Sequence, residues 1–117
     1  MPFTQSRQAK LLRIFIGDAD RWEGRPLAEA LVDAALAQGL AGATVLHGVM
    51  GYGAHARVHT ANMLRLSGNL PVVVEIVDLP ERIAAFLPTV ETMVREGLVT
   101  LEAAEVLLHR PRTEPEA

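Results

Sequence analysis

The chain has 117 residues, of which 50% are hydrophobic and 21% are charged, and its formal net charge at pH 7 is −3. This length suits one domain, because two halves would each be too small to bury a stable core. The weakly acidic balance excludes the broad basic surface that nucleic-acid binding requires, and the absence of cysteine excludes disulfides and thiolate metal sites. We therefore expect a globular protein that does not bind nucleic acid.

The sequence also gives no signal for export or membrane insertion. Its first residues lack the long apolar run that precedes a signal-peptide cleavage site. No apolar run approaches the roughly 20 residues that a helix needs to cross a bilayer. We expect a cytoplasmic protein with an N-terminal extension over residues 1–9, one domain over residues 10–110 and a flexible tail over residues 111–117.

The first half of the chain predicts a strand, a helix and a second strand. Residues 10–17 are rich in Leu, Ile and Phe and predict a strand that ends at Gly17. Trp22 lies in the polar loop that follows and is expected to pack either over the start of the helix or against another subunit. The apolar period predicts a helix over residues 26–39, with Pro26 in its first turn and Gly39 as its left-handed cap. Residues 43–53 regain β-branched character and predict a strand.

The second half begins with the clearest strand. Residues 70–78 are apolar at nearly every position, which is typical of a central, covered strand. Asp78 and Glu81 match a capping box, so a second helix is expected to begin there, to bend at Pro88 and to stop at Gly97. Residues 98–110 are ambiguous: their helical propensity slightly favours a helix, whereas their alternation also allows a strand.

Topology favours the strand, because the order then becomes βαββαβ. This order predicts an α+β, ferredoxin-like fold, in which an antiparallel sheet carries both helices on one face. The other face of such a sheet would be left bare. Since a chain this short cannot cover that face itself, we expect self-association through it.

Residues 47–61 concentrate glycine, histidine and arginine. Gly51, Gly53 and Ala56 formally fit a dinucleotide-binding fingerprint, but that fingerprint needs a parallel βαβ unit, which this order does not provide. The two glycines have two interpretations of equal weight. They either give the backbone freedom at a strand end, or let backbone N–H groups approach an anion, with Arg57 or Arg65 adding positive charge.

The histidines permit a second hypothesis. His55 and His59 have the spacing of a helical metal-binding pair, but a third ligand and an H-E-x-x-H pattern are missing, so exposed loop residues are the simpler interpretation. The chain also lacks a cysteine nucleophile, a serine elbow and an evident pair of carboxylates for acid–base chemistry. We therefore do not expect an enzyme.

Several motifs together resemble a known family. "GRPL", "GLAGATVL", "GYG" and "LPVVVEIVD" stand where they stand in the bacterial family called domain of unknown function one-ninety, a set of small relatives of the nitrogen regulatory protein PII. The match covers about residues 10–109. The resemblance implies a PII-like trimer with its sheets facing inward, and it also implies that the last element is a strand.

The resemblance further implies a binding site. In PII proteins an adenine nucleotide binds between neighbouring subunits beside a Gly-aromatic-Gly turn, which "GYG" matches, and His55 falls where those proteins carry a glutamine. The PII phosphate loop after the second helix is absent here; His109, Arg110 and Arg112 are candidates to replace it, with a solvated tail as the simpler interpretation. Relatives often accompany a membrane fluoride exporter, which implies a transporter partner.

Three hypotheses result. The favoured one is a PII-like regulatory homotrimer that binds a small anionic ligand, such as an adenine nucleotide, near Gly51, Gly53, His55, Arg57 and Arg65. Binding would order the following loop and change its fit to a partner protein. The alternatives are a CutA-like trimer that binds divalent metal through His55 and His59, and a small enzyme that uses the same inter-subunit cleft.

Overall fold

The computed structural model describes residues 6–53, 59–60 and 69–112. Four strands and two helices build the domain; in chain order they are β1 (Arg7–Gly17), α1 (Leu27–Ala37), β4 (Thr44–His47), β7 (Pro71–Asp78), α2 (Pro80–Met93) and β8 (Leu98–Val106). Short pairs are formed by β2 (Arg21–Trp22) with β3 (Arg25–Pro26), and by β5 (Met50–Gly51) with β6 (His59–Thr60). In the described part of the chain, no helix is long and apolar enough to cross a membrane.

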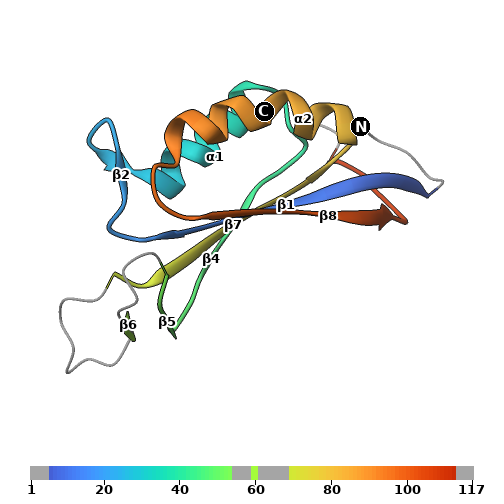
Figure 1. Ribbon diagram of the computed structural model, residues 1–117. Helices are drawn as coiled ribbons and strands as arrows, with labels where there is room; N and C mark the ends of the chain where they lie inside the picture. Colours follow the sequence, from blue (N-terminus) through green and yellow to red (C-terminus); the bar gives the residue numbers. More distant parts are fainter. Residues whose placement is uncertain (1–5, 54–58, 61–68, 113–117) are drawn as a thin grey trace.

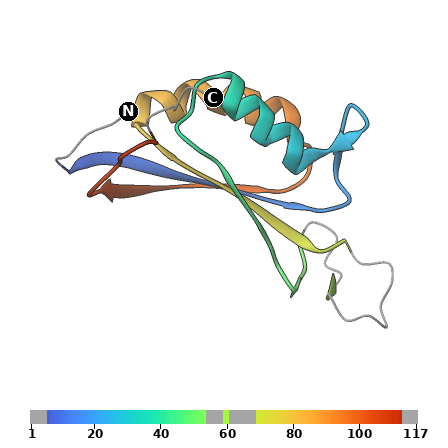
Figure 2. The same ribbon diagram turned by 180° about the vertical axis from the view of Figure 1, so that it is seen from behind.

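The main sheet has the order β4-β7-β1-β8, and every neighbouring pair is antiparallel. Both helices lie on the same side of this sheet (Figures 1 and 2). The predicted ferredoxin-like α+β fold is therefore confirmed. The ambiguous last element is a strand, because it pairs with β1 along its whole length, from Arg7 opposite Val106 to Phe15 opposite Leu98. These long-range contacts outweigh the local helical propensity.

The core lies between the sheet and the helices. Alternate residues of the two central strands point toward the helices, as the period of a strand requires. They are Leu12, Ile14 and Ile16 from β1, and Val72, Val74 and Ile76 from β7, all less than 9% exposed. Leu31 of α1 and Phe86 of α2 are fully buried against them, and the partly buried Trp22 packs against this cluster.

The end of α1 follows the prediction. Gly39 has a φ of 81°, the left-handed conformation that glycine adopts without steric cost. The N–H of Gly39 donates to the carbonyl of Leu36, and the N–H of Leu40 donates to that of Ala35. This pair of bonds is a Schellman motif, which satisfies carbonyl groups at the helix end and turns the chain toward β4.

The start of α2 differs from the prediction. The capping box was wrong: Leu79 occupies the N-cap position, and no side chain caps the helix. Pro80 takes the first helical position, which explains the start, because proline lacks the N–H that would be unpaired there. The helix passes through Pro88 and ends at Met93, before the expected stop at Gly97.

Gly97→Ala is expected to destabilise the domain by about 1–3 kcal/mol, measured as a lower midpoint in urea unfolding. Gly97 turns the chain from α2 into β8 with a φ of 154°, and an added Cβ would lie 2.6 Å from the carbonyl oxygen of Phe15. Gly42→Ala is the matched control, because a Cβ at Gly42 meets no atom within 4 Å. Equal midpoints for the two variants would contradict the prediction.

Candidate functional site

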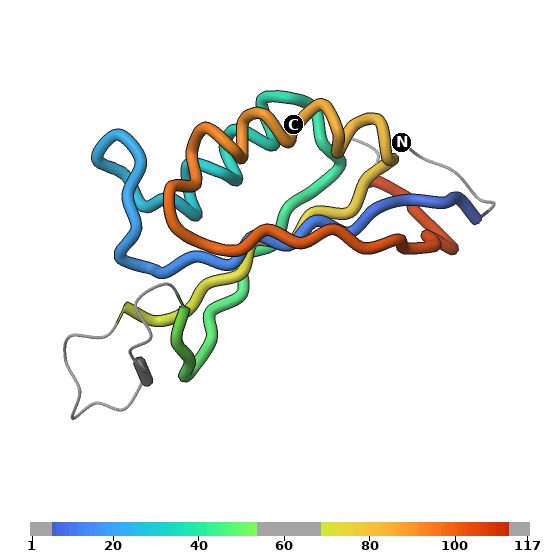
Figure 3. Tube along the Cα trace, in the orientation of Figure 1, coloured from blue at the N-terminus to red at the C-terminus, as the bar shows by residue number. Residues whose placement is uncertain are grey.

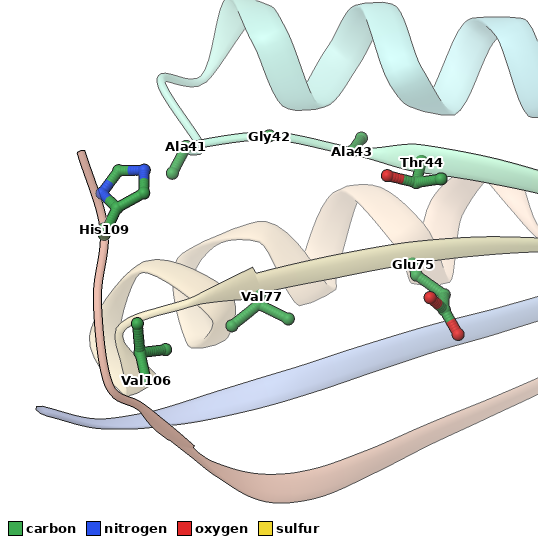
Figure 4. Close-up of a pocket in the computed structure, with 8 residues that line it drawn as sticks. All are labelled: Ala41, Gly42, Ala43, Thr44, Glu75, Val77, Val106 and His109. Carbon is green, nitrogen blue, oxygen red and sulfur yellow. The ribbon is translucent and has the colours of Figure 1, made fainter. Parts of the chain in front are cut away.

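A cavity of about 420 Å³ lies between the connection from α1 to β4 and the strands β7 and β8 (Figure 4). The residues that line it are Ala41, Gly42, Ala43, Thr44, Glu75, Val77, Val106 and His109. In Figure 4 the segment from Ala41 to Thr44 runs along one side, Val77 and Val106 lie on the strands opposite it, and His109 lies beside Ala41. The cavity therefore joins an apolar floor to a few polar groups, the usual composition of a small-molecule site.

Glu75 lines this cavity and also belongs to a network of ion pairs on the sheet. The Nε of Arg13 donates to its Oε2 at 2.8 Å, and an Nη of Arg13 donates to Glu102 at 3.2 Å. The hydrogen bond to Glu75 is the main cause of a raised pKa at Arg13, as expected for a cation held by a carboxylate. Arg13 thus fixes the orientation of Glu75 at the edge of the cavity.

The glycine turn predicted as a ligand site packs against Pro71. A Cβ added at Gly51 would lie 3.1 Å from the Cγ of Pro71, and one at Gly48 would lie 2.7 Å from it. The N–H of Gly48 donates to the carbonyl of Pro71 at 2.7 Å. At Gly51 the missing side chain therefore leaves room for Pro71, an approach that neither interpretation of the two glycines predicted. A Cβ at Gly53 would meet no atom within 4 Å, so that backbone is accessible.

The formal dinucleotide fingerprint is not a Rossmann motif. Gly51 lies in β5, which pairs antiparallel with β6, and the main sheet is antiparallel throughout. No parallel βαβ unit is therefore present in the part of the chain that the structure describes.

Three of the predicted ligand residues, His55, Arg57 and Arg65, lie outside the described residues. His59 is described only by its backbone, which pairs with Gly51. Within residues 6–53 and 69–112, no group of three His, Asp or Glu side chains is arranged to hold a metal ion. The metal-binding hypothesis, which depends on His55 and His59, stays a prediction.

The glycine turn and the cavity lie at different places along β7. Pro71, which contacts the turn, begins the strand, whereas Glu75 and Val77 lie about 13–20 Å further along it at about 3.3 Å per residue. Figure 3 shows the chain from β4 to β5 extending away from the helices, beyond the body of the sheet. One copy of the chain therefore presents two separate candidate surfaces.

The sheet face opposite the helices carries an apolar row across all four strands. The strand registers place Leu46, Val73, Phe15 and Leu98 side by side, in that order. Leu46, Phe15 and Leu98 are 48%, 36% and 59% exposed, although they are large apolar residues. The bare face predicted from the topology is thus present, and it carries the side chains that favour contact with another protein surface.

Sequence reasoning missed the cavity, although one signal for it exists. Glu75 and Val77 alternate with the buried Val74 and Ile76, so the strand period places them on the bare face. The opposite wall is built of Ala, Gly and Thr, which carry no chemical signature. His109, considered above as part of a phosphate grip, lines the cavity, whereas Arg110 and Arg112 are exposed.

The comparison with protein families gives a match over nearly the whole domain. The DUF190 family model, described as "Uncharacterized ACR", matches residues 9–106. The chain belongs to the DUF190 family. A UPF0166 protein of Aquifex aeolicus is 41% identical over 98 residues, which cover 84% of this chain and 92% of that protein. A UPF0166 protein of Methanocaldococcus jannaschii is 35% identical over 100 residues, covering 85% and 92%.

Solved structures show that this DUF190 protein has the fold of PII-like proteins. CPII, a nitrogen regulatory PII-like protein from Thiomonas intermedia bound to ADP, AMP and bicarbonate, superposes with a TM-score of 0.60 at 17% identity, covering 89% of this chain and 92% of CPII. A putative PII-like signaling protein from Thermus thermophilus gives 0.57 at 15% identity, covering 87% and 90%. The resemblance to PII relatives is therefore confirmed at the level of family and fold.

Proposed function

We propose that this DUF190 protein is a PII-like regulatory protein that binds an adenine nucleotide between subunits of a homotrimer. The observation that carries the proposal is the cavity between Ala41–Thr44 and the strands β7 and β8. Its volume of about 420 Å³ lies within the range of about 300–1,000 Å³ typical of small-molecule sites. The ADP and AMP bound to CPII, which shares the fold, support the choice of ligand class.

The chemistry of the cavity suits a flat base with an amino group. Val77 and Val106 supply apolar surface for a ring, and the Thr44 hydroxyl supplies a donor and acceptor at the rim. Glu75 supplies a carboxylate, of which one oxygen is held by Arg13. The other oxygen is an acceptor for the exocyclic amino group of adenine. Guanine presents a carbonyl oxygen at that place, so it would leave two acceptors facing each other.

The phosphates of the ligand require a second surface. The predicted anion-binding residues Gly51, Gly53, His55, Arg57 and Arg65 lie on or after the glycine turn, which is distant from the cavity in the same chain. In a trimer formed through the bare face, the turn of one subunit would meet the cavity of its neighbour. This arrangement agrees with the inter-subunit site that the family resemblance implies.

The regulatory role follows from the same arrangement. Nucleotide bound beside the glycine turn would favour one conformation of the following loop and so change its fit to a partner, since a ligand shifts an equilibrium by its differential affinity for two states. The proposed partner is a membrane transport protein of the fluoride-exporter type. The protein itself is proposed to act by binding and not by catalysis.

Isothermal titration calorimetry of the purified assembly tests the proposal. We expect ADP and AMP to bind with saturable heat, and GDP to bind at least about tenfold more weakly, a difference of about 1.4 kcal/mol. At 100 times its dissociation constant, ADP should stabilise the folded state by about 2.7 kcal/mol. Absence of binding by every adenine nucleotide, with stabilisation by zinc or nickel instead, would replace this proposal with the metal-binding hypothesis.

A further inference from the structure

Asp78 is a fully buried charged side chain at the end of β7, and it is the only buried polar side chain among residues 6–53 and 69–112. Both of its carboxylate oxygens accept a backbone hydrogen bond. Oδ1 accepts from the N–H of Leu79 at 2.7 Å, and Oδ2 accepts from the N–H of Ala41 at 2.8 Å. A buried carboxylate is costly unless such donors satisfy it, so this position requires a specific explanation.

The two hydrogen bonds differ in what they connect. The bond to Leu79 is local and lies at the N-cap of α2. The bond to Ala41 joins the end of β7 to the connection between α1 and β4, across 37 positions of the sequence. Ala41 is the first residue of one wall of the cavity, and Asp78 directly follows Val77 in the other wall. The long-range bond therefore ties the two walls together.

Other contacts fix the chain on either side of this point. Upstream, the Schellman motif holds Gly39 and Leu40, and an Nη of Arg82 donates to the Gly39 carbonyl at 2.6 Å. Downstream, Thr44 is opposite Glu75 in the pairing of β4 with β7. Between these anchored stretches, the bond from Ala41 to Asp78 fixes the backbone against the sheet.

We propose that Asp78 is a positioning residue for the nucleotide site, a role that rests on the proposed nucleotide binding. It has no exposed surface, so it acts through the backbone of Ala41–Ala43 and not through contact with the ligand. Holding this wall in place before the ligand arrives removes the ordering cost that binding would otherwise carry. Loss of the bond should therefore weaken binding even in molecules that remain folded.

Asp78→Asn tests the role. The asparagine amide keeps one acceptor oxygen and turns its NH₂ group toward the second N–H, so one of the two backbone bonds is lost. We expect ADP to bind at least about tenfold more weakly by calorimetry. Val90→Ala, a core change in α2, should lower stability but leave the affinity within about twofold, which separates positioning from general destabilisation.

Hydrogen exchange of the Ala41 amide gives a second measurement, which needs no ligand. In the unliganded wild-type protein this amide should be protected, and Asp78→Asn should accelerate its exchange. An unprotected Ala41 amide in the wild type, or equal ADP affinity in Asp78→Asn and wild type, would overturn the positioning role. Failure of the wild type to bind any adenine nucleotide would instead reject the proposed function, and the role of Asp78 at that site with it.

Discussion

Replacing Phe15 by glutamate is expected to convert the proposed trimer into monomers at micromolar concentration. Phe15 lies in the apolar row of the bare face, between Val73 and Leu98, and is 36% exposed in the single chain. A glutamate there can remain solvated in the monomer. In an assembly that covers the row, each copy would bury an unpaired carboxylate, at an effective cost of several kcal/mol. Trimer formation should therefore be lost.

Light scattering coupled to size-exclusion chromatography measures this effect. The wild type should have the mass of three 12.7-kDa chains, and Phe15→Glu the mass of one. Leu36→Glu is the matched control, because Leu36 is 75% exposed on α1, on the helical side of the sheet. Far-UV circular dichroism should show the same folded spectrum for all three proteins. A trimeric Phe15→Glu variant would show that copies do not meet on this face.

Replacing Ala41 by phenylalanine is expected to weaken ADP binding by at least about tenfold. Ala41 is exposed and lines the cavity, so a larger side chain there takes space that a base would need. The change leaves the backbone N–H that donates to Asp78 in place. Binding should therefore fall because the cavity is filled and not because its wall has moved.

Calorimetry with ADP on two variants decides the point. Ala37→Phe makes the same substitution at an exposed position at the end of α1, outside the cavity, and should leave the affinity within about twofold. Equal affinities for Ala41→Phe and the wild type would place the nucleotide elsewhere. If the wild type forms a trimer but binds no nucleotide, the proposed assembly would stand and the proposed nucleotide site would be rejected.

The fold could be predicted almost entirely from local pattern and topology. The apolar run of residues 70–78, the Gly39 cap and the order of elements each point to one arrangement, and the structure confirms it. The last strand needed more than local pattern, because its stability comes from pairing with β1, which lies nearly the whole chain away. The start of α2 was mistaken because the buried Asp78 uses its carboxylate for Ala41 and Leu79, and not for capping the helix.

The candidate site could be predicted only in part. Arginine, histidine and glycine near Gly51 attract attention in a sequence because their chemistry is distinctive. The cavity wall from Ala41 to Thr44 is made of small residues, whose role comes from the position of their backbone. That position depends on a hydrogen bond between distant parts of the chain, which no local pattern encodes.

Glu75 belongs both to the cavity and to the bare face of the sheet, and this shared position links the two. It lines the cavity, and the strand period places it, together with its ion-pair partner Arg13, on the sheet face where copies of the chain are proposed to meet. Ligand occupancy and subunit association would then be thermodynamically linked, so each would strengthen the other by the same factor. The nucleotide concentration that half-fills the sites would then fall as the concentration of the protein in the cell rises.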